Sequence, residues 1–269
     1  MRILLVILFA LFSGNLAQAG KTPLFIAAEK GHKQAIQTLI ESGANPHKTN
    51  EKEENPLFIA VQKGHAAAVR YLVDAGSSTD KINEAREPLL YTAVKHGDID
   101  MVYTLITGMD GIDVNKAESN YYDTPLHLAV KSSRTEADND DNYTAIAVLL
   151  LQHGARINKR NKDNQSPFNM ALMYNRKDIL RYFLNNSKEQ TVQANKRDTF
   201  YKKNPLQFAV CTGDPETVQL LIDAGAKVNP GDNLISLAQR YSCEQDFIKF
   251  LEEKLKEAAE EEKDKELCP

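Results

Sequence analysis

The sequence has little of several features that mark specialised protein classes. It has 269 residues, no tryptophan and only three cysteines, too few for a small disulfide-rich scaffold. Its 33 basic and 37 acidic residues give a formal charge of −4, without the basic excess of a general nucleic-acid binder. With 13 Gly, 10 Pro and 42% hydrophobic residues, the chain is neither collagen-like, low-complexity nor fully disordered.

The sequence has only one long hydrophobic run, which lies at the N-terminus. A single run excludes a polytopic membrane protein. Arg2 precedes an apolar run from Ile3 to Phe12, and the small-residue pattern Ala17-Gln18-Ala19 follows. A helix of ten residues spans about 15 Å, half of the roughly 30 Å hydrocarbon core. The pattern is typical of a secretory signal peptide. We therefore expect residues 1–19 to be a signal peptide, with no stable membrane insertion after its cleavage.

A six-residue phrase recurs along the rest of the chain. Its copies are TPLFIA at Thr22, NPLFIA at Asn55, EPLLYT at Glu87, TPLHLA at Thr124, SPFNMA at Ser166, NPLQFA at Asn204 and the degraded NLISLA at Asn233. Most copies begin with Thr, Asn or Ser, which cap helix N-termini. Proline comes second in the first six, and it is favoured at the first helical position. Each copy is predicted to begin a short helix, with Glu87 as a poor cap.

Glycines and a second apolar pattern follow each phrase. One set of glycines is expected to end the first helix in the left-handed conformation: Gly31, Gly64, Gly97 and Gly213. Apolar residues then recur at i, i+3, i+4, as in Ile36, Leu39 and Ile40, which places them on one helical face. A second set of glycines closes this helix: Gly43, Gly76, Gly154 and Gly225. Because one such unit cannot bury its own apolar face, the units must stack.

This pattern resembles the ankyrin repeat, whose signature includes T-P-L-H-x-A at a period of about 33 residues. Residues 124–129 match that signature, and Gly31-His32 and Gly64-His65 match the Gly-His turn of the family. The resemblance implies an all-α ankyrin-repeat solenoid of about seven helix–turn–helix repeats, with projecting loops that we call fingers. The expected domain spans 20–251, before an acidic helical tail at 252–269. Its repeats are expected near 21–50, 54–83, 86–117, 123–158, 165–195, 203–232 and 233–251.

The resemblance further implies that the fingers and the inner helices grip another protein. Aromatic and arginine side chains on a polar surface are favoured binding anchors. The candidate partner-binding residues are Tyr121, Tyr122, Asp123, Lys159, Arg160, Lys162, Phe200, Tyr201, Lys202 and Lys203. For each of them, packing within its own finger is an equally good interpretation. The early fingers are instead acidic, at Glu51, Glu53, Glu54, Glu84 and Glu87. This gradient suggests a partner of opposite polarity.

No catalytic or cofactor-binding motif occurs in the sequence. It contains no HExxH, CxxC, G-x-S-x-G or phosphate-binding glycine loop. The motif histidine His127 is expected to make hydrogen bonds within the stack. The segment from Lys131 to Tyr143 interrupts the fourth repeat with an acidic cluster whose spacing does not fit an EF-hand, and a solvated loop is the favoured interpretation. We expect a protein that is not an enzyme and has neither a metal nor a cofactor.

Whether the cysteines form disulfides depends on the compartment of the protein, because an oxidising compartment outside the cytoplasm allows disulfide bonds. Cys211 and Cys243 fall on the same side of adjacent predicted repeats, which makes them the candidate disulfide pair. Cys268 is a poorer partner, since the predicted terminal helix carries it about 35 Å away. The alternative is that all three thiols are free.

The sequence thus predicts a periplasmic or secreted protein, monomeric when unbound, that binds an exported protein. In this interpretation it occludes or regulates an exported enzyme, in the manner of an immunity protein or an inhibitor. The alternative is a secreted effector that binds host proteins, for which the Glu-rich C-terminus would suit a translocation signal. Nucleic acid is not the expected partner, although the basic residues of the later fingers make nucleic-acid binding a weak alternative.

Overall fold

The computed structural model describes residues 22–77, 86–109, 111–132, 140–185, 195, 197–198 and 201–267. The predicted signal peptide at 1–19, Phe200 and Cys268 lie outside these described residues. The chain divides into two compact units, Met1–Ala155 and Arg156–Pro269, called unit 1 and unit 2 below.

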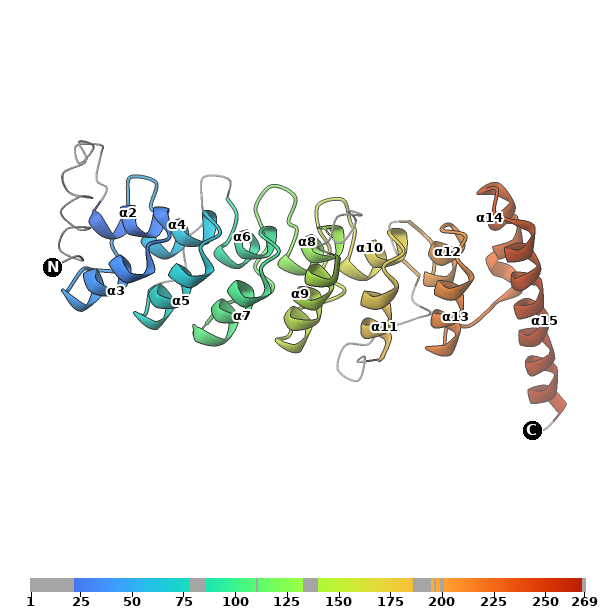
Figure 1. Ribbon diagram of the computed structural model, residues 1–269. Helices are drawn as coiled ribbons and strands as arrows, with labels where there is room; N and C mark the ends of the chain where they lie inside the picture. Colours follow the sequence, from blue (N-terminus) through green and yellow to red (C-terminus); the bar gives the residue numbers. More distant parts are fainter. Residues whose placement is uncertain are drawn as a thin grey trace. The chain divides into compact units, whose positions relative to one another are not determined.

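The described part of unit 1 is a stack of four helix pairs. The first helices of the pairs are α2 (Pro23–Lys30), α4 (Pro56–Gln62), α6 (Leu89–Lys95) and α8 (Pro125–Ser132). The second helices are α3 (Lys33–Glu41), α5 (Ala66–Asp74), α7 (Ile99–Gly108) and α9 (Asp140–Gln152). First helices pack on first helices and second on second, as α2 packs on α4 and α5 on α7. Figure 1 shows these two rows, with the described first and third fingers arching over the row of first helices.

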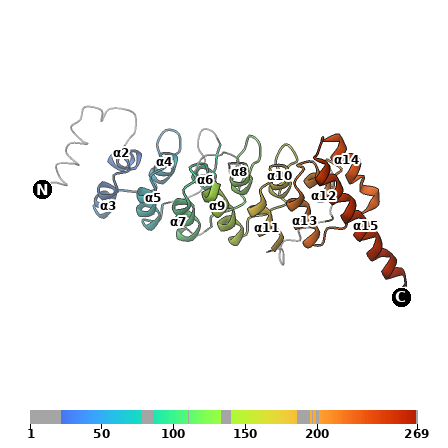
Figure 2. The same cartoon turned by 45° about the vertical axis from the view of Figure 1, so that its right-hand side comes forward.

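The described part of unit 2 continues the same pattern with three helix pairs. Its first helices are α10 (Pro167–Met173), α12 (Pro205–Val210) and α14 (Leu234–Arg240), with the short 3-10 helix η1 (Pro230–Asp232) before α14. Its second helices are α11 (Lys177–Asn185), α13 (Pro215–Asp223) and α15 (Gln245–Leu267). The predicted terminal helix is confirmed, because α15 runs from the last repeat through the acidic tail as one helix (Figure 2).

Helix capping follows the sequence prediction in most repeats. Asn55, Ser166 and Asn204 each accept a hydrogen bond from the backbone N–H three residues later. Asn204 forms a full capping box, since the side chain of Gln207 also accepts from the Asn204 N–H. Such reciprocal bonds satisfy two N–H groups that a helix start otherwise leaves unpaired.

Three helix starts depart from the predicted caps. The side chain of Thr22 makes no capping bond at the start of α2. In the third repeat Pro88 is itself the N-cap and the helix begins at Leu89, while Glu87 forms an ion pair of 2.9 Å with Lys95. Before α14, Asn233 is left-handed with φ of 52° and makes no side-chain cap. The degraded seventh phrase therefore starts a helix without the usual cap.

The predicted glycine turns are confirmed, since all eight glycines have φ between 66° and 87°. Two repeats reach the same conformation without glycine. Asn175 and Ser242, both with φ of 53°, take the turn position in the fifth and seventh repeats. Asparagine tolerates this region better than other side chains do, so the turn geometry is kept where the sequence signal is lost.

The acidic insertion of the fourth repeat is shorter than predicted. α8 continues to Ser132 and α9 begins at Asp140, so Tyr143 lies on a helix and not in a loop. The Tyr143 hydroxyl donates to the Lys95 carbonyl at 3.3 Å, and its ring lies against Gly97. His65 does the same two pairs earlier, with Nε2 3.1 Å from the Glu29 carbonyl and the ring against Gly31. The end of the insertion is therefore helical, and Tyr143 fills this inter-repeat position.

The core of each unit runs between its rows of helices. Fully buried side chains in unit 1 include Leu57, Leu72, Leu105, Leu126 and Leu150, and those in unit 2 include Met170, Leu172 and Leu221. Each lies on the face that packs on the neighbouring pair, as stacking requires. Among the described residues, no helix is both long enough and apolar enough to cross a bilayer.

Candidate partner-binding surface

Each described finger is a tight turn held by one side chain. In the first finger Asn50 Oδ1 accepts from the N–H groups of Lys52 and Glu54, both at 2.9 Å. Asn161 Oδ1 accepts from Asp163 and Gln165 in the fourth finger, at 3.1 and 2.9 Å. These local bonds satisfy backbone groups that a projecting loop would otherwise leave to water. The fingers are therefore preorganised.

The same turn requires a left-handed residue two positions before the repeated phrase. Glu53, Tyr122, Asn164 and Lys202 take this position, with φ between 55° and 60°. Only Asn164 has a side chain suited to this conformation. The other three are therefore held there by the bonds of the finger, at a cost in backbone energy.

The third finger exposes two tyrosines at its tip. The Glu118 carboxylate accepts from the N–H groups of Asn120 and Tyr121 at 2.7 and 2.6 Å, and from that of Asp123 at 3.2 Å. Tyr121 and Tyr122 are 59% and 55% exposed. The turn thus presents two large rings to solvent on a fixed backbone.

Asp123, predicted to contact a partner, is buried instead, with 5% of its surface exposed. Its carbonyl accepts from the Glu118 N–H, which closes the base of the third finger. Burial, followed by the nearby charges of Asp123, Glu118 and Glu87, raises the pKa of Tyr91. Asp123 therefore acts inside the finger, against the first helix α6, and is not available as a direct contact.

Arg160 is likewise committed to the structure of unit 2. Its guanidinium donates to Asp198 Oδ2 and to the Asn164 carbonyl, both at 2.7 Å. Asp198 is buried and also accepts from Asn169 Nδ2 at 2.8 Å and from the Tyr201 N–H at 2.7 Å. Arg160 thus joins the fourth finger to the fifth. Of the other basic residues predicted there, Lys162 is exposed and Lys159 is half-buried.

The fifth finger places Lys203 between aromatic rings. Its ammonium lies 5.9 Å from the centroid of Phe208 and 5.5 Å from that of Tyr241. Tyr201 packs edge-on against Phe208, with ring centroids 5.6 Å apart. Tyr201 and Lys203 are half-exposed, Lys202 is exposed, and Tyr241 is 49% exposed. The structure therefore brings two predicted residues, Tyr201 and Lys203, together with Phe208 and Tyr241.

Sequence reasoning missed Tyr241 and Phe208 because it looked for binding residues in the fingers. Phe208 lies within α12, and Tyr241 is the C-cap of α14. The available signal was the aromatic residue three positions after the apolar phrase of the seventh repeat, at Tyr241. Repeat stacking places that residue beside the preceding finger.

The two described cysteines are free thiols with different partners. Cys211 Sγ accepts from Lys203 Nζ at 3.3 Å and donates to the Gln207 carbonyl at 3.0 Å. Cys243 Sγ donates to the Val210 carbonyl at 3.7 Å, and burial together with the proximity of Cys211 raises its pKa. The disulfide between them stays a prediction, which peptide mapping of the purified protein under non-reducing conditions would test.

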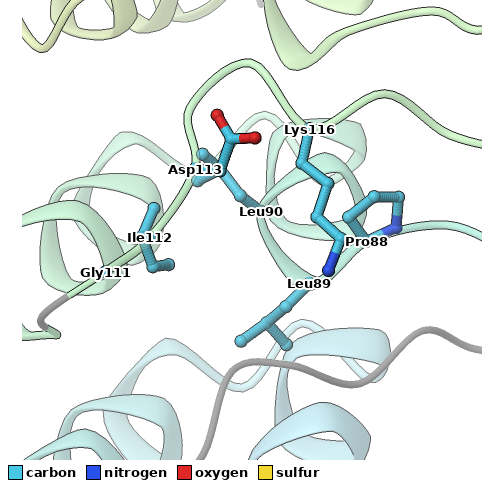
Figure 3. Close-up of a pocket in the computed structure, with 7 residues that line it drawn as sticks. All are labelled: Pro88, Leu89, Leu90, Gly111, Ile112, Asp113 and Lys116. Carbon is cyan, nitrogen blue, oxygen red and sulfur yellow. The ribbon is translucent and has the colours of Figure 1, made fainter.

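A hollow of about 300 Å³ lies in unit 1, beside the start of α6. Figure 3 shows its lining residues, with Lys116 reaching over Pro88 and the Asp113 carboxylate turned away from Leu89. Asp113 is bound to its own turn, where it accepts from the Asn115 N–H at 2.8 Å. The described residues contain no group of three His, Cys, Asp or Glu side chains that could hold a metal. The hollow offers apolar contact and one cation, but no pairing of nucleophile and base.

His127 has the structural role predicted for the motif histidine. It is fully buried, and its Nδ1 accepts from the Thr124 N–H at 3.1 Å and lies 2.7 Å from the Thr124 hydroxyl. The hydroxyl in turn accepts from the His127 N–H at 3.3 Å. The pair caps α8, and full burial keeps the His127 ring away from the surface.

Comparison with known proteins supports the resemblance to ankyrin repeats that the sequence pattern indicates. The family model described as ankyrin repeats (3 copies) matches residues 4–83 and 137–232. An ankyrin repeat protein of fowlpox virus, FPV031, is 29% identical over 114 residues, 42% of this chain and 30% of the viral protein. The chain thus spans about a third of the length of this curated relative.

Among solved structures, the human ASB11 ankyrin repeat domain is similar in fold. It aligns with a TM-score of 0.57 and 22% identity, over 82% of this chain and 97% of that domain. Ankyrin repeats indicate a protein–protein interaction module, and the family is generally a non-catalytic binding scaffold. The family model covers more than half of the residues, and the helix pairs, turns and capping phrase agree with it, so this chain belongs to the ankyrin repeat family.

Proposed function

We propose that this protein is exported and binds another exported protein through its fingers and first helices, occluding or regulating it. The observation that carries the proposal is the pair of exposed tyrosines, Tyr121 and Tyr122, on the fixed tip of the third finger. The apolar run after Arg2 and the Ala17-Gln18-Ala19 pattern support the export part of the proposal.

Rigid tyrosines are effective anchors for a partner protein. A tyrosine side chain buries a large area on binding, while only its two side-chain torsion angles lose freedom. The entropy cost of binding is therefore low. The Glu118 hydrogen bonds fix the backbone beneath both rings before any partner arrives. Most of the binding energy of an interface comes from a few such residues.

Capture with a matched surface variant tests the binding part. The purified protein and the double variant Tyr121→Ser, Tyr122→Asn would each be incubated with an exported fraction of the source cells. The control is Tyr103→Ser, since Tyr103 is 52% exposed in the same unit but lies on the second helix α7. The double variant should lose the captured protein while the control keeps it. Equal capture by both variants would overturn the role of the third finger.

Fractionation tests the location, and separates this proposal from the effector alternative. Retention of the cleaved chain in the periplasm favours regulation of an exported enzyme, whereas release into a host favours an effector. If the captured protein is an enzyme, its activity should fall as this protein is added in stoichiometric amounts. Unchanged activity would limit the function to scaffolding or protection.

A further inference from the structure

In the described part of unit 2, the cations of the fifth finger and of the end of α14 form no ion pair with a described carboxylate. Arg197, Lys202, Lys203 and Arg240 take part in none of the ion pairs among the described residues. With the rings of Tyr201 and Tyr241 they form what we call the basic ridge. The Arg197 Nε–H donates to the Lys202 carbonyl at 2.7 Å, and Lys203 Nζ donates to the Tyr241 hydroxyl at 3.5 Å. These bonds link the fifth finger to Tyr241 at the end of α14, and Arg240 is the residue before Tyr241 in the chain.

On the second helices of the same unit, by contrast, cations form ion pairs with nearby carboxylates. Lys177 lies 3.0 Å from Asp214 and 2.7 Å from Glu216, and Arg181 pairs with Asp178 and Glu216. These cations are neutralised by the next repeat. On the ridge the nearest described acid of the finger, Asp198, is buried and bound to Arg160 and Asn169. The ridge thus keeps a net positive charge that the remainder of the unit does not have.

Lys203 is the centre of the ridge because neutral groups hold it in place. Its contacts are the Cys211 thiol at 3.3 Å, the Tyr241 hydroxyl and the two aromatic faces. Partial burial lowers the pKa of Lys203, but hydrogen bonds to Cys211 and Tyr241 outweigh it and raise the pKa. A cation held between rings loses little freedom on binding an anion, and the rings exclude water around it.

We propose that the basic ridge is the docking site for an acidic, extended segment of the partner protein, with a partner carboxylate on Lys203 and apolar contact on Tyr201 and Tyr241. This inference rests on the proposed function that the chain binds a protein. Charge complementarity supports it, because unpaired cations beside aromatic rings attract carboxylates and speed association.

The surroundings favour an acidic protein segment over nucleic acid. α15 packs on α14, and it exposes Glu252, Glu253 and Glu257 in the same unit. These carboxylates would repel a long phosphate backbone, whereas a segment with a few acids can be confined to the ridge. The formal charge of −4 for the whole chain points the same way.

Selection from a library of displayed short random peptides on the purified full chain tests the proposal. Peptides that bind should be rich in Asp and Glu, and Lys203→Gln and Tyr241→Ala should each weaken the best peptide about tenfold. The matched control is Lys249→Gln, which removes the same charge from an exposed site on α15. It should change the affinity less than twofold. The variant Lys203→Glu should shift the selection towards basic peptides.

The outcomes separate this inference from the proposed function. Acidic peptides that lose affinity with Lys203→Gln but not with Lys249→Gln support it. Peptides that depend on Tyr121 and Tyr122 but not on Lys203 would retain protein binding and overturn the ridge as an acidic docking site. Tighter binding of single-stranded DNA than of any peptide, or self-association that Lys203→Gln abolishes, would also overturn it. Failure to select any peptide would count against both. Melting curves of each variant confirm that it is folded.

Discussion

At the residue scale, backbone conformation in the fingers is decided by hydrogen bonds more than by residue type. Glu53 is exposed and left-handed with φ of 60°, a conformation in which its Cβ approaches the backbone carbonyl. The N–H of Glu53 donates to the Asn50 carbonyl at 3.0 Å, which closes the turn around it. The backbone of the finger is therefore strained at Glu53, and glycine at this position would remove the strain.

Replacing Glu53 by glycine should raise the free energy of unfolding by about 0.5–1 kcal/mol, since relief of the left-handed strain exceeds the entropy that glycine adds to the unfolded chain. Urea unfolding measures this change. Glu51→Gly is the control, because Glu51 lies in the same finger, is exposed and does not have a positive φ. It should be neutral or destabilising. A gain of the same size from both substitutions would show that strain is not the cause.

Asp214 combines two roles at one carboxylate. It caps α13 by accepting from the Thr217 N–H at 3.0 Å, and it pairs with Lys177 at 3.0 Å. Burial raises the pKa of Asp214, but the hydrogen bonds from Thr217 and Lys177 outweigh it and lower the pKa below its ordinary value. The ionised form is therefore bound more tightly in the folded state than in the unfolded chain.

Asp214→Ala should cost about 1–2 kcal/mol at neutral pH, the usual loss for a helix cap. A lowered folded pKa means that the stabilisation is complete above the unfolded pKa and is lost as the pH falls through the folded value. The difference between wild type and variant should thus shrink below about pH 4. Unfolding curves at neutral and acidic pH test this, with the exposed Asp178→Ala as control. A difference that is independent of pH would contradict the assigned role.

At the element scale, α15 is one helix with two environments. Phe247, Ile248 and Leu251 are buried in its first two turns. Beyond them the described positions are exposed or half-exposed, as at Glu257 and Glu260. The first part therefore covers the apolar face of the last repeat, and the acidic remainder faces solvent, as a terminal repeat requires.

Removal of residues 260–269 should change the free energy of unfolding by less than about 0.5 kcal/mol, since exposed helical positions contribute little. Phe247→Ala should instead cost about 3 kcal/mol, the lower end for a buried phenylalanine. Denaturant unfolding of both variants measures the contrast. A truncation as costly as Phe247→Ala would show that the acidic segment is part of the core.

At the scale of the whole molecule, the chain is a series of neighbour contacts. Each helix pair packs on the pairs before and after it within its unit, as α12 packs on both α10 and α14. Stability in such arrays is close to a sum of repeat and interface terms, so a local loss need not spread through the chain. The division into two compact units marks a boundary at which such a local loss of stability can stop.

Leu221→Ala, at a fully buried position in α13, should cost about 2–5 kcal/mol locally. Hydrogen exchange followed by mass spectrometry should show loss of protection in unit 2, while the amides of unit 1 keep theirs. The matched variant Leu105→Ala, at a fully buried position in α7 of unit 1, should give the reverse pattern. A uniform loss across both units in either variant would show that the chain unfolds as one cooperative body.

The sequence by itself determined the repeat architecture, because its signals are local. Caps such as Asn204 and turns such as Gly31 act on the backbone within a few residues of themselves. Periodic repetition then requires stacking, since no single pair can bury its face. Even the structural role of His127 follows from its place in the phrase.

The tertiary structure alone decided which surface residues are available. Asp123 and Arg160 have the composition of binding residues, but contacts within and between fingers occupy them. Lys203 meets Tyr241 across 38 positions of sequence, because one repeat stacks its helix end beside the finger of another. Repeat position specifies the backbone location of a residue, whereas its side-chain neighbours come from a second repeat whose residues vary independently. The basic ridge is therefore a property of the stacked structure.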